Sequence, residues 1–269
     1  MAGLKKLQYS ISILIFGGLL LQSHARSWQN SLFDAPAGPY KKKKHCKLRY
    51  SLTWKGSVKA GECSVEFDRN RGKSKPVKVK CNGYTSGLAR SVFPYDFNLH
   101  SRYNGRTLEP YSYHIWEKTR DETKELKGTF SGDTVRVKNK TSPLDSSKVK
   151  HSSKTFTYPQ MYDLYSSILY IGSQPLANND KINLVIYPFD EPYLAMVSVL
   201  GRERHKGHNC IKLDLKMKKI RSDLSLKEYE KMKSTTMWIT DNTDRVMVEL
   251  RSEVFIGDVR ATLKSSEWY

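Results

Sequence analysis

Apolar and polar residues alternate along a stretch near the start of the chain. Its apolar or aromatic positions are Cys46, Leu48, Tyr50, Leu52 and Trp54, and polar residues stand between them. Because successive side chains of a strand point to opposite faces of a sheet, this alternation predicts a half-buried strand over residues 46–54.

A second pair of alternating segments follows and can be placed in register. A turn closed around Asn70-Arg71-Gly72-Lys73 pairs Cys63 with Cys81, Val65 with Val79, Phe67 with Val77 and Glu66 with Lys78. Directly opposite Cβ atoms in a sheet lie about 4.5–5.5 Å apart, which a disulfide can adjust to. We therefore predict a Cys63–Cys81 disulfide, and Cys46 and Cys210 would pair only by elimination.

Further strand-like segments continue to the end of the chain. Residues 97–103 and 107–116 flank the turn dipeptide Asn104-Gly105, and residues 124–130 and 134–138 flank Ser131-Gly132-Asp133. Residues 139–154 are polar and rich in Ser and Lys, which indicates an exposed loop. Strand patterns then resume at residues 181–187, 194–203, 209–216, 236–240, 245–253 and 255–263. The fold class is thus all-β and mainly antiparallel, as one barrel-like, half-barrel or sandwich domain.

One helix interrupts the strands. Apolar residues at Met161, Leu164, Tyr165, Ile168 and Leu169 have helical spacing, with Pro159 before them and Gly172 after them. We expect this helix to cover one open end of the sheet, with its apolar stripe serving as core packing.

The N-terminal residues resemble an export signal. Lys5 and Lys6 precede an apolar run over residues 11–21, which ends in the small-residue site Ser23-His24-Ala25. The run is about half of the roughly 20 residues that a membrane-spanning helix needs, so we expect cleavage rather than anchoring. The predicted organisation is a signal peptide at 1–25, a flexible basic leader at 26–44 and a β domain at 45–269. No transmembrane helix is expected after signal removal, and the product is expected in the periplasm or cell envelope.

The chain is strongly basic. It holds 46 Lys and Arg against 27 Asp and Glu, a formal net charge of +19, and this excess attracts polyanions. In an exported protein, the expected partners are anionic lipid or an envelope polymer, and no specific nucleic acid is expected. The charges are scattered, with one cluster at residues 41–44, so charge alone also fits a role in solubility.

Few residues suggest catalysis or metal binding. His205, His208 and Cys210, with His45 and Cys46 of the first strand as partners, are ligand types for zinc or copper. The two histidines lie in a sequence that resembles a hairpin turn ending at Gly207, where polar residues are expected without a metal. The chain has no Gly-x-Ser-x-Gly elbow. We therefore expect no catalytic residues, no metal and no cofactor.

Several stretches together resemble the DUF3108 family of exported bacterial proteins. They are residues 48–56 with Lys59-Ala60-Gly61, residues 163–170, Leu200-Gly201-Arg202-Glu203 through Gly207 to Cys210-Ile211-Lys212, residues 237–241 with Arg245-Val246, and residues 257–263. The resemblance covers residues 45–265 and implies an antiparallel, barrel-like envelope protein without known catalytic residues. Cys63, Cys81 and an insertion at residues 225–233 depart from the family pattern.

The aromatic residues suggest a binding role. The chain has 16 Tyr, 9 Phe and 5 Trp, many of them alternating along strands. Such side chains fill a small barrel or line an apolar cavity in a wider one, and the candidate lining residues are Tyr50, Leu52, Trp54, Tyr111 and Tyr113. The expected function is a non-catalytic envelope binding or scaffolding protein that holds a lipid or other amphiphile. The alternatives are an envelope hydrolase acting on a polymer and a structural partner of an envelope assembly.

Overall fold

The computed structural model describes residues 28–41, 44–68, 76–230, 232–254 and 257–269. The expected signal peptide and the turn at residues 70–73 lie outside these residues. In chain order the elements are η1 (Gln29–Ser31), β1 (Cys46–Trp54), β2 (Val58–Asp68), β3 (Val77–Thr85), α2 (Gly87–Val92), β4 (Asp96–Tyr103), β5 (Pro110–Lys118), β6 (Glu122–Ser131), β7 (Thr134–Pro143), β8 (Lys150–Thr157), β9 (Met161–Asp163), α3 (Leu164–Ser173), β10 (Lys181–Tyr187), β11 (Tyr193–His205), β12 (His208–Ile220), β13 (Leu226–Glu228), β14 (Met232–Thr240), β15 (Met247–Val254) and β16 (Gly257–Trp268).

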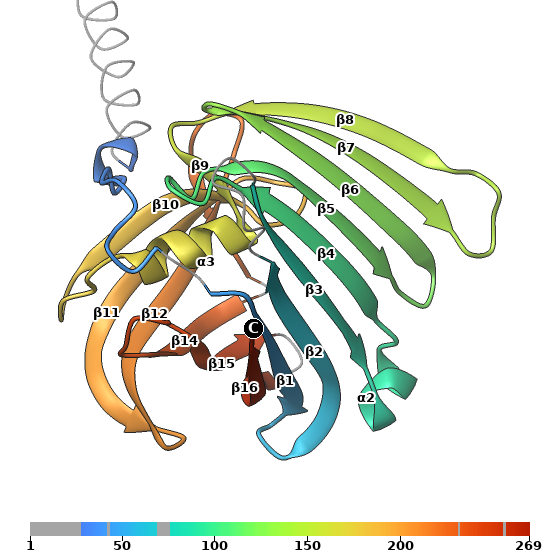
Figure 1. Ribbon diagram of the computed structural model, residues 1–269. Coiled ribbons are helices and arrows are strands. Elements are labelled where there is room, and N and C mark those ends of the chain that lie inside the picture. The colour runs from blue at the N-terminus through green and yellow to red at the C-terminus, as the bar shows by residue number, and fades with distance from the viewer. Residues whose placement is uncertain (1–27, 42–43, 69–75, 231, 255–256) are drawn as a thin grey trace, which may run out of the picture.

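The strands form one large curved sheet that does not close. Its order is β8-β7-β6-β5-β4-β3-β2-β1-β16-β15-β14-β12-β11-β10-β9, so β8 and β9 are the two edges, and β13 pairs with β12. Neighbouring strands are antiparallel except β9 and β10, which are parallel. Figure 1 shows the sheet wrapped around α3, which lies on its concave side. The predicted all-β, mainly antiparallel class is confirmed, in its half-open barrel form.

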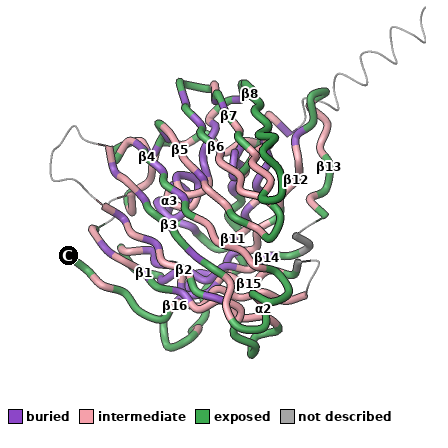
Figure 2. The backbone as a smooth tube through the Cα atoms, turned by 90° about the vertical axis from the view of Figure 1, so that its right-hand side faces the viewer, coloured by how far each residue is buried: buried purple, intermediate pink, exposed green. Residues whose placement is uncertain are grey.

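Alternation explains which side of each strand is buried. Along β3 the residues Val77, Val79 and Cys81 are buried, whereas the side chains between them are at least partly accessible. The buried positions appear in Figure 2 as purple segments that alternate with pink and green ones along the strands. The core therefore lies on the concave side, between the sheet and α3.

The helix α3 begins later than the sequence pattern predicts. Met161 to Asp163 form the short strand β9 beside Val185 to Tyr187 of β10. Asp163 then caps the helix, because its carboxylate accepts hydrogen bonds from the backbone N–H groups of Tyr165 and Ser166. The hydroxyl of Ser166 accepts in return from the N–H of Asp163 at 3.0 Å, which completes a capping box.

The predicted register of the β2–β3 hairpin is wrong by two residues. Val65 lies opposite Cys81, and Cys63 lies opposite Gly83. A slip of two residues leaves every side chain on the same face, so the apolar alternation fits both registers equally well. Cys63 and Cys81 are diagonal neighbours and free thiols, and the predicted disulfide between them is not formed.

The predicted loop at residues 139–154 is also wrong. Strand β7 continues to Pro143, and residues 150–157 form the edge strand β8, with Lys138 opposite Ser153 and Val137 opposite Lys154. Most side chains of β8 are exposed. Backbone pairing at a solvated edge thus produces a strand without the apolar alternation that reveals strands in a sequence.

Residues 28–41 pack against the sheet end and α3 rather than forming a separate flexible leader. Trp28 is buried, and its indole N–H donates to the carbonyl of Leu224 at 2.9 Å. The backbone N–H of Gly38 donates to the hydroxyl of Ser173, and the hydroxyl of Tyr170 donates to the carbonyl of Ala35. Hydrogen bonds to Leu224, Ser173 and Tyr170 thus hold residues 28–41 against the rest of the fold.

The remaining predicted hairpins are confirmed, including the one around Asn104-Gly105 between β4 and β5. Within the described part of the chain, no helix has the length and apolar character needed to cross a membrane.

Candidate functional site

A partly open cavity of about 410 Å³, the inner cavity, lies between α3 and the concave face of the sheet. The sheet contributes apolar side chains to its wall from both halves, among them Leu48, Val65, Phe97, Leu99, Val197, Met237 and Leu250. The helix contributes Leu164, Ile168 and Leu169. Since the wall is mainly hydrocarbon and aromatic, the cavity suits an apolar ligand better than a charged one.

Small residues leave the space that this cavity occupies. At Gly83, an added Cβ would lie 2.6 Å from the Phe97 ring and 2.8 Å from the Cβ of Cys63, so the Phe97 ring can sit flat against the strand. Ala195 and Ala261 face the cavity from β11 and β16. Larger residues at these positions would fill part of the cavity.

The polar groups of the cavity wall include the uncharged Tyr50, Tyr165 and Cys63, and Glu117 adds a carboxyl group that accepts from the Tyr95 hydroxyl. Tyr50 donates its hydroxyl to the carbonyl of Met247 at 3.1 Å, and burial raises the pKa of Tyr50 well above its ordinary value. Burial likewise raises the pKa of Tyr165 on α3. The hydrogen bond with Cys81, followed by burial, raises the pKa of the Cys63 thiol. These phenols and this thiol therefore stay protonated at neutral pH.

Charged residues gather where the cavity wall meets the loop after β14 and the N-terminal segment. Lys41 and Arg245 contribute positive charge there and Asp244 contributes negative charge, whereas Lys216 borders the cavity from β12, away from that loop. The Arg245 guanidinium lies 4.2 Å from the centre of the Tyr40 ring and binds the Asp241 carboxylate at 2.7 Å. Burial alone would raise the pKa of Asp241, but Arg245 and Arg202 outweigh it and lower the pKa.

A family model matches residues 49–264, which is most of the chain, and its description is "Protein of unknown function (DUF3108)". The chain belongs to the DUF3108 family. The predicted resemblance is thereby confirmed.

Among the solved structures that match this DUF3108 protein are a DUF1849 protein and the lipoprotein LppX. A β-barrel-like protein of the domain of unknown function DUF1849 from Brucella abortus matches with a TM-score of 0.59 and 10% identity, over 85% of this chain and 99% of that one. The lipoprotein LppX of Mycobacterium tuberculosis matches with a TM-score of 0.26 and 9% identity, over 81% of this chain and 84% of that one. The first likeness shows the fold. No curated protein matches the chain.

Of the five lining residues predicted from the sequence, the DUF3108 structure places one in the cavity wall. Tyr50 lines the cavity, whereas Leu52 and Trp54 lie further along β1, beyond it. Tyr113 is buried but packs on Phe130 and Tyr187 instead.

The fifth predicted residue, Tyr111, is 45% exposed because β5 carries a bulge. Arg102 pairs with Ser112 and Tyr103 pairs with Pro110, so Tyr111 is the extra residue between them. A bulge shifts the alternation by one position, and Tyr111 and Tyr113 then face different surroundings.

The main lining residues that the sequence reasoning missed are on α3 and β4. The apolar stripe of α3 was interpreted as core packing, although Leu164, Ile168 and Leu169 also border the cavity. Phe97 and Leu99 alternate along β4 and carry the same signal as β1. Only the curvature of the whole sheet decides which of several alternating strands face empty space.

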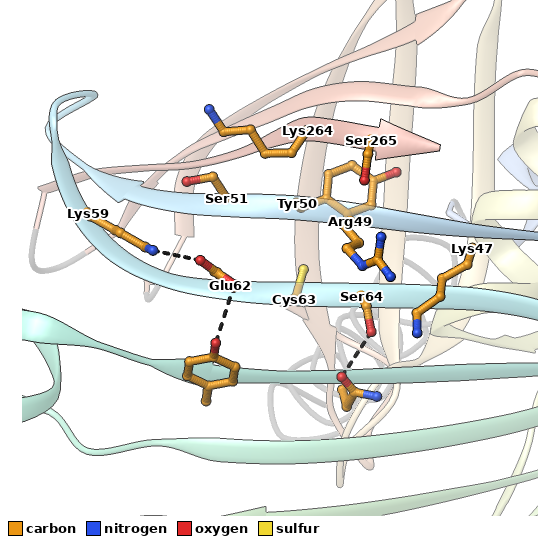
Figure 3. Close-up of a pocket in the computed structure, with 12 residues that line it drawn as sticks. Lys47, Arg49, Tyr50, Ser51, Lys59, Glu62, Cys63, Ser64, Lys264 and Ser265 are labelled. Atoms are coloured by element: carbon orange, nitrogen blue, oxygen red, sulfur yellow. Dashed lines mark hydrogen bonds and ion pairs between the residues drawn. The ribbon is translucent and has the colours of Figure 1, made fainter. Parts of the chain in front are cut away.

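A second pocket, of about 560 Å³, lies over β16, β1, β2 and β3 on the outer side of the sheet. Figure 3 shows its basic side chains Lys47, Arg49, Lys59 and Lys264. Arg49 pairs with Glu267, and Lys59 pairs with Glu62 at 2.6 Å. Ser64 donates to the side-chain oxygen of Asn82 at 2.9 Å. This pocket is polar and open to solvent.

The histidines considered as metal ligands have other contacts. The ring of His205 stacks on Trp238, with centroids 4.2 Å apart, and its Nε2 lies 3.5 Å from the Glu249 carboxylate. The Cys210 thiol contacts the carbonyl of His205 at 3.9 Å. Among the described residues, no group of three or more His, Cys, Asp or Glu side chains is arranged to hold a metal ion.

Proposed function

We propose that this DUF3108 protein is an exported, non-catalytic binding protein of the cell envelope that holds a lipid or another amphiphile in the inner cavity. The observation that carries the proposal is the apolar wall of that cavity, built from both halves of the sheet and from α3. Its volume lies within the roughly 300–1,000 Å³ range of small-molecule sites.

The polar groups of the wall offer hydrogen bonds to a ligand. Burial raises the pKa of Tyr50 and of Tyr165, so these phenols stay protonated at neutral pH. The hydrogen bond between the two cysteine thiols raises the pKa of Cys63 and lowers the pKa of Cys81.

The charges beside the cavity favour an anionic head group. Lys41 and Arg245 border the wall on the side of the N-terminal segment, and the whole chain carries +19. An alkyl chain in the cavity would leave its head group near these cations. Anionic lipids of the envelope are the ligands of matching chemistry.

The first experiment is mass spectrometry of an organic extract from the protein purified gently from the envelope fraction. A similarly basic exported protein serves as the control. Enrichment of one anionic lipid class over the control is expected. An extract without bound lipid would leave the cavity without a ligand and contradict the proposal.

A pair of variants on one strand tests whether the inner cavity is the site. Ala261 faces the inner cavity and Lys264 lines the outer pocket, both on β16. Ala261→Trp should lower the affinity for a fluorescent fatty acid at least about tenfold, since the indole occupies the space that the ligand needs. Lys264→Trp should leave the affinity unchanged. Equal losses in both variants would place the ligand elsewhere.

A further inference from the structure

The short helix α2 presents apolar side chains to solvent. Leu88 and Val92 are each 75% exposed, and Phe93, the residue after the helix, is 50% exposed. Leu88 and Val92 are four residues apart and therefore lie on one face of the helix. We call Leu88, Val92 and Phe93 the α2 tip. In Figure 1, α2 projects at one end of the sheet, where β3 ends and β4 begins.

Hydrogen bonds and an ion pair hold this helix firmly in place. The backbone N–H of Ser86 donates to the carbonyl of Ala60 at 2.9 Å, which ties the start of α2 to β2. Arg90 binds both carboxylate oxygens of Asp96, at 2.8 and 2.9 Å. Arg120 donates to the carbonyl of Ser91 at 2.7 Å. Since the backbone is fixed, the apolar side chains cannot turn inward, and their exposure is part of the folded structure.

The α2 tip is connected to the inner cavity by a row of aromatic rings. The ring of Phe93 lies 5.8 Å from the ring of Tyr95, and Tyr95 lies 5.8 Å from Phe97. Tyr95 and Phe97 both line the cavity. Apolar surface therefore continues from the outside of the molecule to the proposed binding site.

Size and charge favour a lipid bilayer over a protein as the partner of this tip. A stable protein interface buries roughly 800 Å² on each partner, which three side chains cannot supply. A short apolar face suffices for the interfacial region of a bilayer, where it sinks about 5–10 Å. Arg120 lies beside the tip, whereas the charge of Arg90 is balanced by Asp96. The net charge is +19, or +17 without Lys5 and Lys6 of the expected signal peptide, and it attracts an anionic surface.

We propose that the α2 tip docks this protein on an anionic bilayer, with Leu88, Val92 and Phe93 seated among the lipid head groups. Docking there brings the Phe93–Tyr95–Phe97 row to the membrane surface, so that a lipid can pass along it into the cavity. The docking step stands without the proposed function, whereas the passage of a lipid rests on it.

The test compares two triple variants of the full mature protein. The first is Leu88→Ser, Val92→Ser and Phe93→Ser. The matched control is Leu144→Ser, Val149→Ser and Leu200→Ser, because these residues are 53%, 42% and 54% exposed on other parts of the surface. Co-sedimentation is measured with vesicles of phosphatidylethanolamine and phosphatidylglycerol, and with vesicles of phosphatidylcholine alone. Circular dichroism and the thermal midpoint verify that each variant folds.

The wild-type protein and the control should bind the anionic vesicles, and the tip variant should bind them at least about tenfold more weakly. Wild-type binding to phosphatidylcholine should also be weaker. Equal binding by all three proteins would overturn the proposal, as would no binding by the wild type. A wild-type dimer that the tip substitutions convert to a monomer would also overturn it, in favour of a second copy as the occupant.

The fluorescent fatty acid separates this proposal from the proposed function. The tip variant should keep the wild-type affinity for the free fatty acid in solution, because its cavity is intact. Ala261→Trp should dock on vesicles normally and lose the fatty acid. If the wild type binds the vesicles but does not bind the fatty acid, the result contradicts the proposed function and supports the docking proposal.

Discussion

The inner cavity and the outer pocket lie on opposite faces of the same strands and differ in nearly every property. Both touch Tyr50 and Cys63, and both are bordered by β1, β2 and β16. The inner wall presents Leu48 and Val65, whereas the outer wall presents Lys47 and Ser64, their immediate neighbours in sequence.

This contrast shows what a strictly alternating strand can do. One run of residues builds an apolar chamber on one side and a hydrated, cationic surface on the other, without any insertion or loop. Neighbouring residues of one strand can therefore give an apolar wall on the inner face and a basic surface on the outer face.

The largest expected effect comes from placing a charge on the inner face. Val79 is fully buried on β3, so Val79→Asp should lower the free energy of unfolding by roughly 3 kcal/mol or more, because the carboxylate would have no partner there. Lys80→Ser, on the outer face of the same strand, should change it by less than about 0.5 kcal/mol. Urea denaturation measures both. Similar losses of unfolding free energy in the two variants would contradict the assignment of an apolar inner face and a solvated outer face.

A smaller effect is expected where a glycine makes room on the inner face. An added Cβ at Gly128 of β6 would lie 2.0 Å from the Tyr113 ring, which is buried. Gly128→Ala should therefore cost about 1–3 kcal/mol of stability through overpacking. The outward neighbour change Lys127→Ala is the control, with an expected cost below about 1 kcal/mol for its ion pair with Glu125. Thermal denaturation of the two variants compares the costs, and a stable Gly128→Ala protein would show that the Tyr113 ring can move.

The smallest expected effects are on the pH dependence of stability, because carboxylates on the two faces have pKa values shifted in opposite directions. Burial raises the pKa of Asp163, inside the fold, whereas the hydrogen bond from Lys59 lowers the pKa of Glu62, outside it. A raised pKa in the folded state means that ionisation opposes folding, so the Asp163 contribution to stability falls as pH rises above the ordinary value of 3.8. Glu62 has the opposite sign, and its contribution falls as pH drops through its lowered pKa.

Two substitutions at Asp163 separate its charge from its cap. Asp163→Ala should cost about 1–2 kcal/mol, because the N–H groups of Tyr165 and Ser166 lose their acceptor. Asp163→Asn keeps an acceptor and removes the buried charge, so it should cost less and remove the fall in stability with rising pH. Urea denaturation across pH 4 to 8, with Glu62→Gln as the exposed control, measures this. An Asn variant as unstable as the Ala variant would contradict the cap assignment.

The strand and helix content could be predicted because the spacing of apolar residues within each segment indicates its secondary structure. The β4–β5 hairpin around Asn104-Gly105 and the six later strand segments carry a period of two, and α3 carries a helical stripe. These signals need only neighbouring residues. The class of fold followed from their number and spacing.

The details that failed depend on information that periodicity lacks. The β2–β3 register differs from the predicted one by two residues, and such a shift preserves the face of every side chain. The bulge at Tyr111 adds one residue on one strand, which the alternation of its neighbours does not reveal. The edge strand β8 is exposed along most of its length, so its sequence lacks the alternation of apolar and polar residues that predicts a strand.

The candidate site was predicted in kind and largely missed in its residues. An aromatic-lined concavity was expected, and Tyr50 lies in it, but Leu52, Trp54, Tyr111 and Tyr113 do not. The cavity exists because distant strands such as β4 and β15 curve around α3. No single segment encodes that curvature. The helix α2 was missed because its six residues carry only Leu88 and Val92 at helical spacing, which are too few to show a period.

The pairing of β1 with β16 joins the two ends of the domain, with Cys46 opposite Trp268. Every other link in the sheet connects segments that are nearer in sequence, so each half can pair its strands without the other. The seam between them must wait for the final dozen residues, since β16 alone bridges β1 and β15. A chain cut short before β16 would keep two exposed strand edges facing one another, each a template for pairing with another molecule. Pairing of β16 with β1 and β15 therefore removes the two strand edges that would otherwise favour aggregation.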